Sequence, residues 1–364
     1  MDEHPGHQFP YDALFWPVAA AASAGSMAAQ FFGRAPDVEI EAGRQEPQPA
    51  TPSRLALDLH AVRLRDFSRI DRGIPTLLCT PLALHGAVVA DLVGGHSLVA
   101  ALLGAGSDRL LMVDWRSASA DMRFLAIDDY LAELNVLVDH VGGLVDLVGL
   151  CQGGWLSLLY AGRFPAKVRK LVMAGAPVDT AARPSVLSTL ASATPFAVFQ
   201  NLVDQGGGRV IGRDVAPFWG QDMDADHLRE TLQTQAPVGS TEFARLERIF
   251  NIWNSWYIDV PGRYYLEVID RFYKRNELAS GHFVALGQTI ELSRLRHPIF
   301  LLAGGADQVT TPDQLLAVQR LVGTPPQDIQ HEIAPCNHLG LFMGRQTLQQ
   351  NWPRIVRWMQ QRSD

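Results

Sequence analysis

The sequence has few cysteines and no excess of positive charge. Three cysteines in 364 residues are too few, and odd in number, for a disulfide scaffold. They favour a reducing compartment in which a single thiol can act as a nucleophile. Lysine and arginine together number 31 against 38 aspartates and glutamates, a net charge of −7, and no basic stripe is present. A nucleic-acid partner is therefore not expected, and the cytoplasm is the expected compartment.

A convincing membrane-spanning run is also missing. The candidate at residues 13–32 is uncharged, but it is rich in alanine and contains Pro17. Acidic residues precede it, so a secretory signal is not indicated. We expect a helix packed on the globular body, with a surface-seeking helix on an apolar phase as the alternative. A proline-rich linker then reaches residue 54.

What the sequence does have is a sizeable apolar core, since 47% of its residues are hydrophobic. From about residue 55, short apolar runs alternate with helical patterns, which is typical of a parallel sheet with helices on both faces. Strands are expected at residues 75–80, 110–115, 144–150, 170–174, 299–304 and 329–334. Helices are expected at residues 91–103, 127–141, 155–162, 312–321 and 346–360.

The alternation breaks between residues 179 and 295. This stretch has a glycine cluster at 206–208 and a dense run of aromatics from Phe250 to Tyr273. An insertion of this size must lie above the carboxyl edge of the sheet, where it would cap any site at that edge. Most of its aromatics are expected in its own core, and some are expected to line a substrate site. The predicted division is an N-terminal helix and linker (1–54), a core in two parts (55–178 and 296–364) and a helical cap (179–295).

The predicted strand that ends at Leu150 runs into a nucleophile-elbow pattern, G-x-C-x-G, in residues 149–154 (GLCQGG). Its small residues are needed because the nucleophile of such an elbow sits in a strained turn between a strand and a helix. Cysteine stands where serine is usual. The pattern predicts Cys151 as the nucleophile, and a buried structural cysteine between packing glycines is the alternative.

In hydrolases with such an elbow, an acid and then a histidine follow the nucleophile along the chain. The sequence supplies Asp307 after the strand at 299–304 and His338 after the strand at 329–334. We therefore predict a triad of Cys151, Asp307 and His338, in which Asp179 is the rival acid. The predicted fold class is α/β, an α/β-hydrolase with a mostly parallel sheet, flanking helices and an inserted helical cap.

The oxyanion of the reaction needs two amide donors. We expect them at the backbone of Gln152, the residue after the nucleophile, and near Leu82 in the loop after the first predicted strand. His85 in that loop is a candidate for lining the site. The other candidates for substrate lining are Trp155, Trp253, Trp256 and Tyr257. Cys79 is expected in the core and Cys336 to be incidental, and neither a metal nor another cofactor is expected.

At these residues the chain resembles the polyhydroxyalkanoate synthases and the intracellular polyhydroxyalkanoate depolymerases, over about residues 75–360. The elbow, residues 160–165 (YAGRFP) and residues 176–179 (APVD) are similar to the synthases. Stretches similar to the depolymerases are residues 81–91, 113–116, 179–185, 264–267 and 338–345 (HLGLFMGR). The resemblance implies a Cys-Asp-His triad on an α/β-hydrolase fold, with Cys151, Asp307 and His338 at the matching positions.

The chain departs from both patterns. Gly153 stands where depolymerases usually have proline, and Asn337 where both families usually have glycine. Because the depolymerase-like stretches fall in and next to the cap, our hypothesis is hydrolysis of short-hydroxyacid polyester through a thioester acyl-enzyme. The alternatives are a synthase that polymerises hydroxyacyl-CoA and an esterase or thioesterase on another acyl substrate. The expected partners are a polyester or hydroxyacyl substrate and a polyester granule surface, and the sequence leaves open whether the chain forms a homo-oligomer.

Overall fold

The computed structural model describes residues 46–219 and 223–361. The helix predicted at residues 13–32 and most of the predicted linker lie outside the described residues. The last residues of that linker are described, and they are held on the body: the backbone amide and hydroxyl of Thr51 both donate to the buried carboxylate of Asp91, at 2.8 and 2.9 Å.

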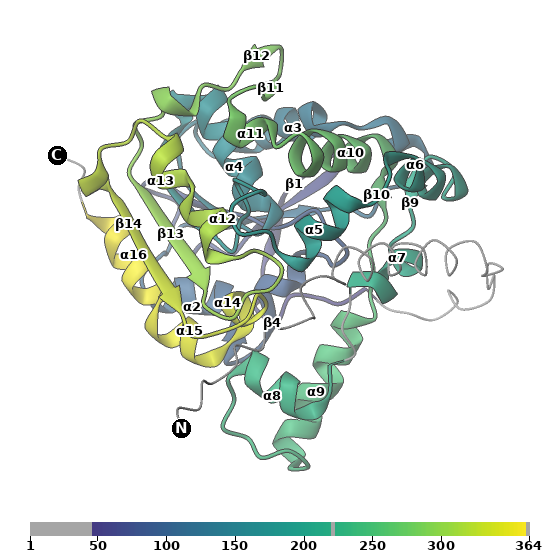
Figure 1. The fold of residues 1–364 in the computed structure, drawn as a ribbon. Helices are drawn as coiled ribbons and strands as arrows, with labels where there is room; N and C mark the ends of the chain where they lie inside the picture. The colour runs from purple at the N-terminus through teal and green to yellow at the C-terminus, as the bar shows by residue number, and fades with distance from the viewer. Residues whose placement is uncertain (1–45, 220–222, 362–364) are drawn as a thin grey trace, which may run out of the picture.

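An eight-stranded sheet forms the centre of the molecule (Figure 1), in the order β1-β2-β6-β3-β7-β8-β13-β14. The predicted strands appear as β3 (Thr76–Cys79), β6 (Leu110–Trp115), β7 (Val145–Leu150), β8 (Val168–Ala174), β13 (Ile299–Gly304) and β14 (Ile329–Ala334). All six are paired in parallel. The continuous apolar runs were readable because inner parallel strands are buried on both faces.

Two antiparallel strands at one edge of the sheet were not predicted. They are β1 (Arg54–Asp58) and β2 (Val62–Asp66), and β2 pairs with β6. Both are short and contain charged residues (RLALD and VRLRD), and β2 buries alternate side chains. Such a pattern is typical of strands that are covered on one face only.

Helices cover both faces of the sheet. Successive residues of β7 point to opposite faces, so Leu147 packs in one hydrophobic cluster and Val148 in the other. The first cluster includes residues of α3 (Ile127–His140) and α4 (Gln152–Arg163). The second includes residues of α2 (Leu98–Gly104), α14 (Gly340–Met343), α15 (Arg345–Gln350) and α16 (Trp352–Gln360).

Three predicted helices differ from the structure. The first part of the predicted helix at 91–103 is instead a hairpin of β4 (Asp91–Val93) and β5 (His96–Ser97). Helix α2 begins at Leu98, where the Ser97 hydroxyl caps it by accepting a hydrogen bond from Ala100 N. Gly95, at φ 85°, allows the turn between the two strands. The predicted helices at 312–321 and 346–360 are each two helices, respectively α12 (Pro312–Leu316) with α13 (Val318–Leu321) and α15 with α16.

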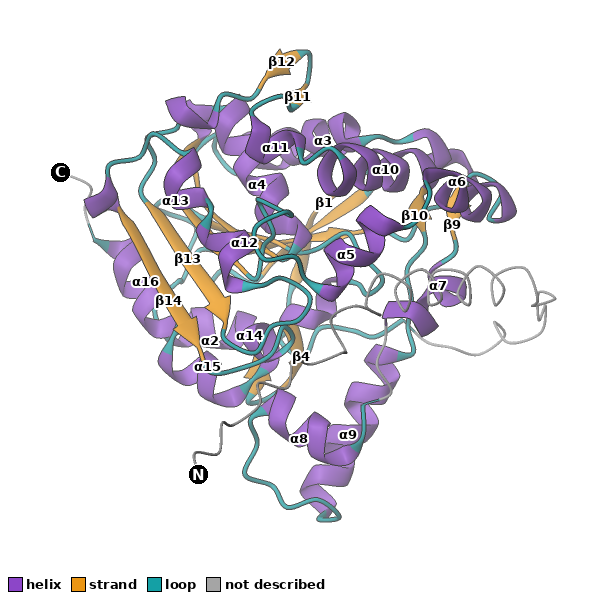
Figure 2. Ribbon diagram, in the orientation of Figure 1, coloured by secondary structure: helices purple, strands orange, loops and turns teal. Residues whose placement is uncertain are grey.

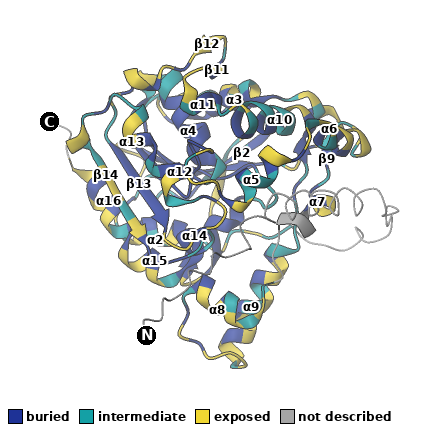
Figure 3. Ribbon diagram, viewed as in Figure 1, coloured by how far each residue is buried: buried dark blue, intermediate teal, exposed yellow. Residues whose placement is uncertain are grey.

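Between β8 and β13 the chain is largely helical (Figure 2). The elements there are α5 (Val186–Ala193), α6 (Phe196–Gln205), β9 (Arg209–Val210), α7 (Gly212–Trp219), α8 (Ala225–Leu232), α9 (Thr241–Asn254), β10 (Val260–Pro261), α10 (Gly262–Glu267), a π-helix (Val268–Lys274), α11 (Glu277–Ser280), β11 (Val284–Ala285) and β12 (Gln288–Thr289). The pair α8 and α9 projects from the body and is more exposed than the strands (Figure 3). The four-part division of the chain stays a prediction.

Within the described ranges, no single helix has the length and apolar composition needed to cross a bilayer. Helices α5 and α6, bent by 92° relative to each other, meet these criteria only as a pair.

Candidate active site

Cys151 occupies a strained turn between β7 and α4. Its backbone has φ 48° and ψ −119°, a conformation that a residue with a side chain rarely adopts. The turn is tight because its glycines touch their neighbours: a Cβ on Gly153 would lie 2.2 Å from the Cys79 carbonyl oxygen, and one on Gly149 would lie 2.4 Å from Gly154 Cα. The small residues of the G-x-C-x-G pattern are therefore a steric requirement of this turn.

Asp307 and His338 lie at the carboxyl ends of β13 and β14 and contact each other. His338 Nδ1 is 2.7 Å from Asp307 Oδ2. The other carboxylate oxygen of Asp307 accepts the backbone amides of Val309 and Thr310, each at 2.8 Å. Because these bonds hold the fully buried carboxylate in one orientation, they also fix the tilt of the imidazole.

The third member of the predicted triad reaches the same imidazole. Burial lowers the pKa of His338, but the negative charges of Asp307 and Cys151, with a hydrogen bond to each, raise it well above its ordinary value. Gly175 sits against the ring, since a Cβ there would lie 3.2 Å from His338 Cε1. The structure thus brings Cys151, His338 and Asp307 together, and such an arrangement can hold a thiolate beside an imidazolium. Their catalytic roles stay a prediction.

The rival acid, Asp179, is engaged elsewhere. Its carboxylate accepts a hydrogen bond from Asn276 Nδ2 at 2.7 Å and forms an ion pair with Arg320. It serves to hold the start of the segment between β8 and β13 against α11 and α13, and Asp307 is the carboxylate beside His338.

The two expected oxyanion donors come from the elbow itself and from the loop after β3. Gln152 is the first residue of α4, so its amide has no acceptor within the helix. Leu82 is buried in the loop after β3. Neither backbone amide donates a hydrogen bond to another described residue, which leaves both free for an oxyanion. The Gln152 side chain contacts Tyr264, whose hydroxyl donates to Oε1 at 3.4 Å. The oxyanion role of both amides stays a prediction.

Four of the predicted lining residues form one cluster beside this loop. The ring of His85 lies 4.4 Å from that of Trp253 and 5.3 Å from that of Tyr257, and its Nδ1 is 3.2 Å from the Trp256 carbonyl oxygen. Burial lowers the pKa of His85 to about 4, although the Trp256 carbonyl acts in the opposite direction. His85 is therefore neutral at physiological pH.

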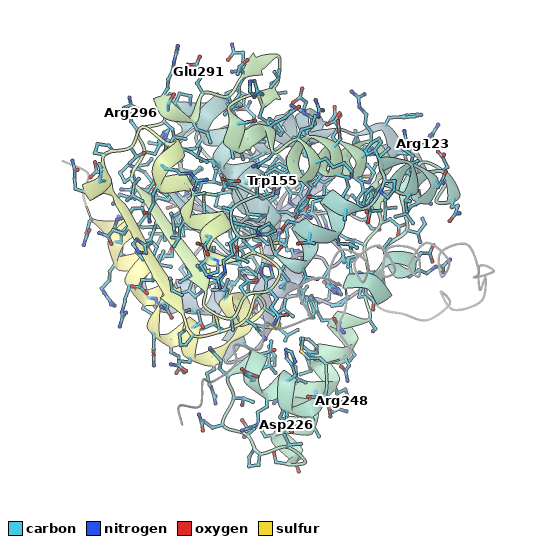
Figure 4. All side chains as sticks on the ribbon, viewed as in Figure 1. Arg123, Trp155, Asp226, Arg248, Glu291 and Arg296 are labelled. Atoms are coloured by element: carbon cyan, nitrogen blue, oxygen red, sulfur yellow. The ribbon has the colours of Figure 1, made fainter. Side chains whose placement is uncertain are left out.

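Trp155 does not belong to this cluster. It lies on α4 in the middle of the molecule (Figure 4), fully buried and packed against Phe272 with ring centroids 5.0 Å apart. It is fully buried because it faces the interior from the first turn of α4, and its role in lining the site stays a prediction.

Two tyrosines near the nucleophile were not singled out by the sequence reasoning. Burial raises the pKa of Tyr264 and of Tyr273 well above its ordinary value, and the charge of Cys151 raises both further. Tyr264 comes from α10 and Tyr273 from the π-helix that follows it. The dense aromatic run was the available signal, but the wider turn of a π-helix shifts which residues face the core, and an α-helical periodicity does not show this.

The other two cysteines, Cys79 and Cys336, are buried in the protein interior. Burial raises the pKa of Cys79 to about 12 and that of Cys336 to about 11. Both are buried, so neither competes with Cys151 as an exposed nucleophile.

Comparison with known proteins identifies a family and a fold. A family model described as "PHB de-polymerase C-terminus" matches residues 175–363. Among solved structures, the chain is similar to a monoacylglycerol lipase of Paleococcus ferrophilus, with a TM-score of 0.53, 16% identity and coverage of 82% of this chain and 98% of that one. An epoxide hydrolase of Bacillus megaterium gives a TM-score of 0.51 at 14% identity, with coverage of 83% and 98%. These likenesses confirm the predicted α/β-hydrolase fold.

The curated relatives correct the expected reaction. The poly(3-hydroxyalkanoate) polymerase subunit PhaC of a Synechocystis strain is 28% identical, over 79% of this chain and 78% of its own. The subunits of the same name from Haloferax mediterranei and Allochromatium vinosum are each 26% identical, over 86% and 81% of this chain and 65% and 85% of their own. The expectation of polyester hydrolysis is therefore wrong, and the polymerase alternative is favoured. The stretches in and next to the cap that resemble depolymerases were therefore not a reliable sign of the reaction.

Proposed function

This chain belongs to the polyhydroxyalkanoate synthase and depolymerase family, and we propose that it is a polymerase that transfers hydroxyacyl groups from CoA to the hydroxyl end of a growing polyester. The observation that carries the proposal is a cysteine elbow in contact with an Asp307-oriented histidine, in a chain similar to polymerase subunits. The alternative of an esterase on another small acyl substrate has no comparable support.

The first half of the reaction loads the enzyme. His338 takes the proton of Cys151, and the thiolate attacks the thioester carbonyl of hydroxyacyl-CoA. The amides of Gln152 and Leu82 donate to the oxyanion that forms. When the tetrahedral intermediate collapses, the C–S bond to CoA breaks, His338 returns the proton to the leaving CoA thiolate, and the hydroxyacyl group remains on Cys151 as a thioester.

The second half extends the chain. His338 takes the proton of the hydroxyl of the acceptor, and the oxygen attacks the carbonyl of the acyl-cysteine. The bond to Cys151 breaks, the proton on His338 returns to the thiolate, and an ester replaces a thioester. Because the ester is less reactive than the thioester, the product is stable toward the same nucleophile.

A cysteine suits this sequence of steps. The CoA thioester and the enzyme thioester have nearly the same free energy of hydrolysis. The acyl-enzyme therefore stays reactive enough to transfer its acyl group to a hydroxyl. Protection from water is then essential, and the buried aromatic surroundings of Cys151, with Tyr264 and Tyr273, support a site that excludes it.

The test is incubation of the purified full chain with hydroxybutyryl-CoA, with free CoA and insoluble polymer measured together. We expect CoA release that matches polymer formed, and neither from Cys151→Ala. The matched control is Cys336→Ala, a buried thiol that should leave both unchanged within a few-fold. CoA release matched by free hydroxybutyrate, without polymer, would show a thioesterase. An absence of CoA release would also contradict the proposal.

A further inference from the structure

A cavity of about 570 Å³ lies next to β2 and β6, and none of the triad residues lines it. Its walls come from β2, from the loops after β3 and β6, and from the end of α9. This volume is within the usual range for a small-molecule site. The residues that matter for its chemistry are Glu46, Arg63, Arg65, Asp114, Trp253 and Trp256.

One wall carries guanidinium groups that share a carboxylate. Arg63 and Arg65 lie two residues apart on β2 and so point to the same face. Their Nε atoms lie 3.1 and 2.6 Å from the same oxygen, Asp114 Oδ2. Asp114 balances only one of the two half-buried guanidinium charges, so this wall has room for a second anionic partner.

The second anionic partner in this structure is Glu46, which pairs with Arg63 from the solvent-exposed side. Its Oε1 lies 2.6 Å from Arg63 Nη2, yet its side chain is 43% exposed, against 19% for Arg63 and 16% for Arg65. An exposed carboxylate of this kind contributes little and is readily displaced. A phosphate, with more charge and more acceptor oxygens, would compete well with it. The pair of Arg116 and Asp58 at the cavity is more exposed and balances itself.

Two tryptophans give the cavity an aromatic wall. Trp253 is 2% exposed, and its ring packs against that of His85 with centroids 4.4 Å apart. Trp256 is half-buried and offers an indole on which a flat base can stack.

The cavity is connected to the reacting atoms by one short loop. Leu82, whose amide we expect at the oxyanion, precedes Gly86 of the cavity wall by four residues, which limits their separation to about 14 Å. His85 lies between them in the chain, and its ring packs against that of Trp253 at a tilt of 37°. The pantetheine arm of CoA is a long chain of single bonds and can cover such a distance.

We infer that this cavity binds the nucleotide end of the acyl-CoA, with its phosphates at Arg65 and Arg63 and its adenine against Trp256. The inference rests on the proposed function and adds to it a site for the leaving group. Glu46 then acts as a competitor that the phosphates displace.

The experiment compares two thioesters of the same hydroxyacyl group. Hydroxybutyryl-CoA carries the nucleotide, whereas hydroxybutyryl-N-acetylcysteamine carries only the end of the arm. We expect Arg65→Gln to raise KM for the CoA thioester about tenfold with little change in kcat, since about 1.4 kcal/mol of binding is lost. Kinetics with the short thioester should not change. Arg54→Gln is the matched control, since Arg54 is an exposed arginine of β1 outside the cavity.

A second variant tests the same site in the opposite direction. Glu46→Gln removes the competing carboxylate. The variant should fold because the side chain is exposed. It should lower KM for the CoA thioester about twofold to threefold, because the phosphates no longer have to displace a carboxylate. An unchanged KM for the CoA thioester in both variants would overturn the inference, as would equal changes for the two thioesters. If the wild type released thiol from neither thioester, the proposed function itself would fail.

Discussion

Cys79 and Cys151 belong to neighbouring strands of the same sheet, and their surroundings give them opposite properties. Cys79 ends β3 with its thiol fully buried and bonded to Ser157, and burial raises its pKa to about 12. Cys151 stands directly after β7 at positive φ, partly exposed and in contact with His338. Two thiols of the same sheet thus differ because of the turn and the neighbours of each, and on this ground we predict Cys151 and not Cys79 as the nucleophile.

The largest expected effect comes from exchanging the thiol in each region. Cys151→Ala should reduce polymerisation at least 10³-fold, because no other group can form the acyl-enzyme. Cys79→Ala should keep most activity and lose about 1 kcal/mol of stability from the small cavity it leaves. CoA release and denaturant unfolding measure the two effects. Comparable losses of activity in both variants would contradict the assignment of the nucleophile.

The next effect separates the two carboxylates. Asp307→Asn should cut the rate on the order of 10³–10⁴-fold, because an amide permits the wrong imidazole tautomer and removes the charge that raises the pKa of His338. The loss should be most severe at neutral pH and above, where the imidazolium is no longer maintained.

Asp179→Asn is the matched control. It loses the ion pair with Arg320 but leaves His338 oriented, so it should reduce stability while the rate changes less than tenfold. A pH–rate profile and thermal unfolding of both variants make the distinction. The opposite result would move the acid to Asp179.

A smaller effect concerns the contact between the two strands. Gly153→Ala would place a Cβ 2.2 Å from the Cys79 carbonyl oxygen, so the elbow must shift. We expect the free energy of unfolding to fall by several kcal/mol and most of the activity to be lost. Gly94→Ala is the control, since open space surrounds Gly94. The free energy of unfolding of this variant should change by no more than about 0.5 kcal/mol. Normal stability of Gly153→Ala would show that the turn is not so tight.

The smallest effect is a pH dependence at His85. An unfolded histidine titrates near pH 6.5, and burial lowers the pKa of His85 in the folded state to about 4. Between these values the unfolded chain binds more protons, so the folded state loses stability as the pH falls from 6.5 to 4. His85→Phe keeps a ring against Trp253, so between pH 6.5 and pH 4 its free energy of unfolding in urea titrations should fall by about 2–3 kcal/mol less than that of the wild type. Parallel curves for the two proteins would contradict the burial of a neutral imidazole.

Prediction from the sequence succeeded best where one local pattern decides the structure. Most of the six parallel strands were readable because they carry short apolar runs. The order of Cys151, Asp307 and His338 placed each at a strand end. The edge strands β1 and β2 were missed because they are short and contain several charged residues. The sequence also did not show that Trp155 is fully buried, since a helical residue after the elbow can face the core or the site.

The parallel strands, the strained turn at Cys151 and the family could be read from the amino-acid sequence, because these follow from local apolar runs, from glycines that a turn requires and from residue order. The folded chain was needed to show which carboxylate orients His338, which aromatics lie around His85 and how Arg63 and Arg65 come to share Asp114. These are contacts between segments far apart in the chain. Their geometry depends on how helices and loops pack over the sheet, and no periodicity within a single segment records it.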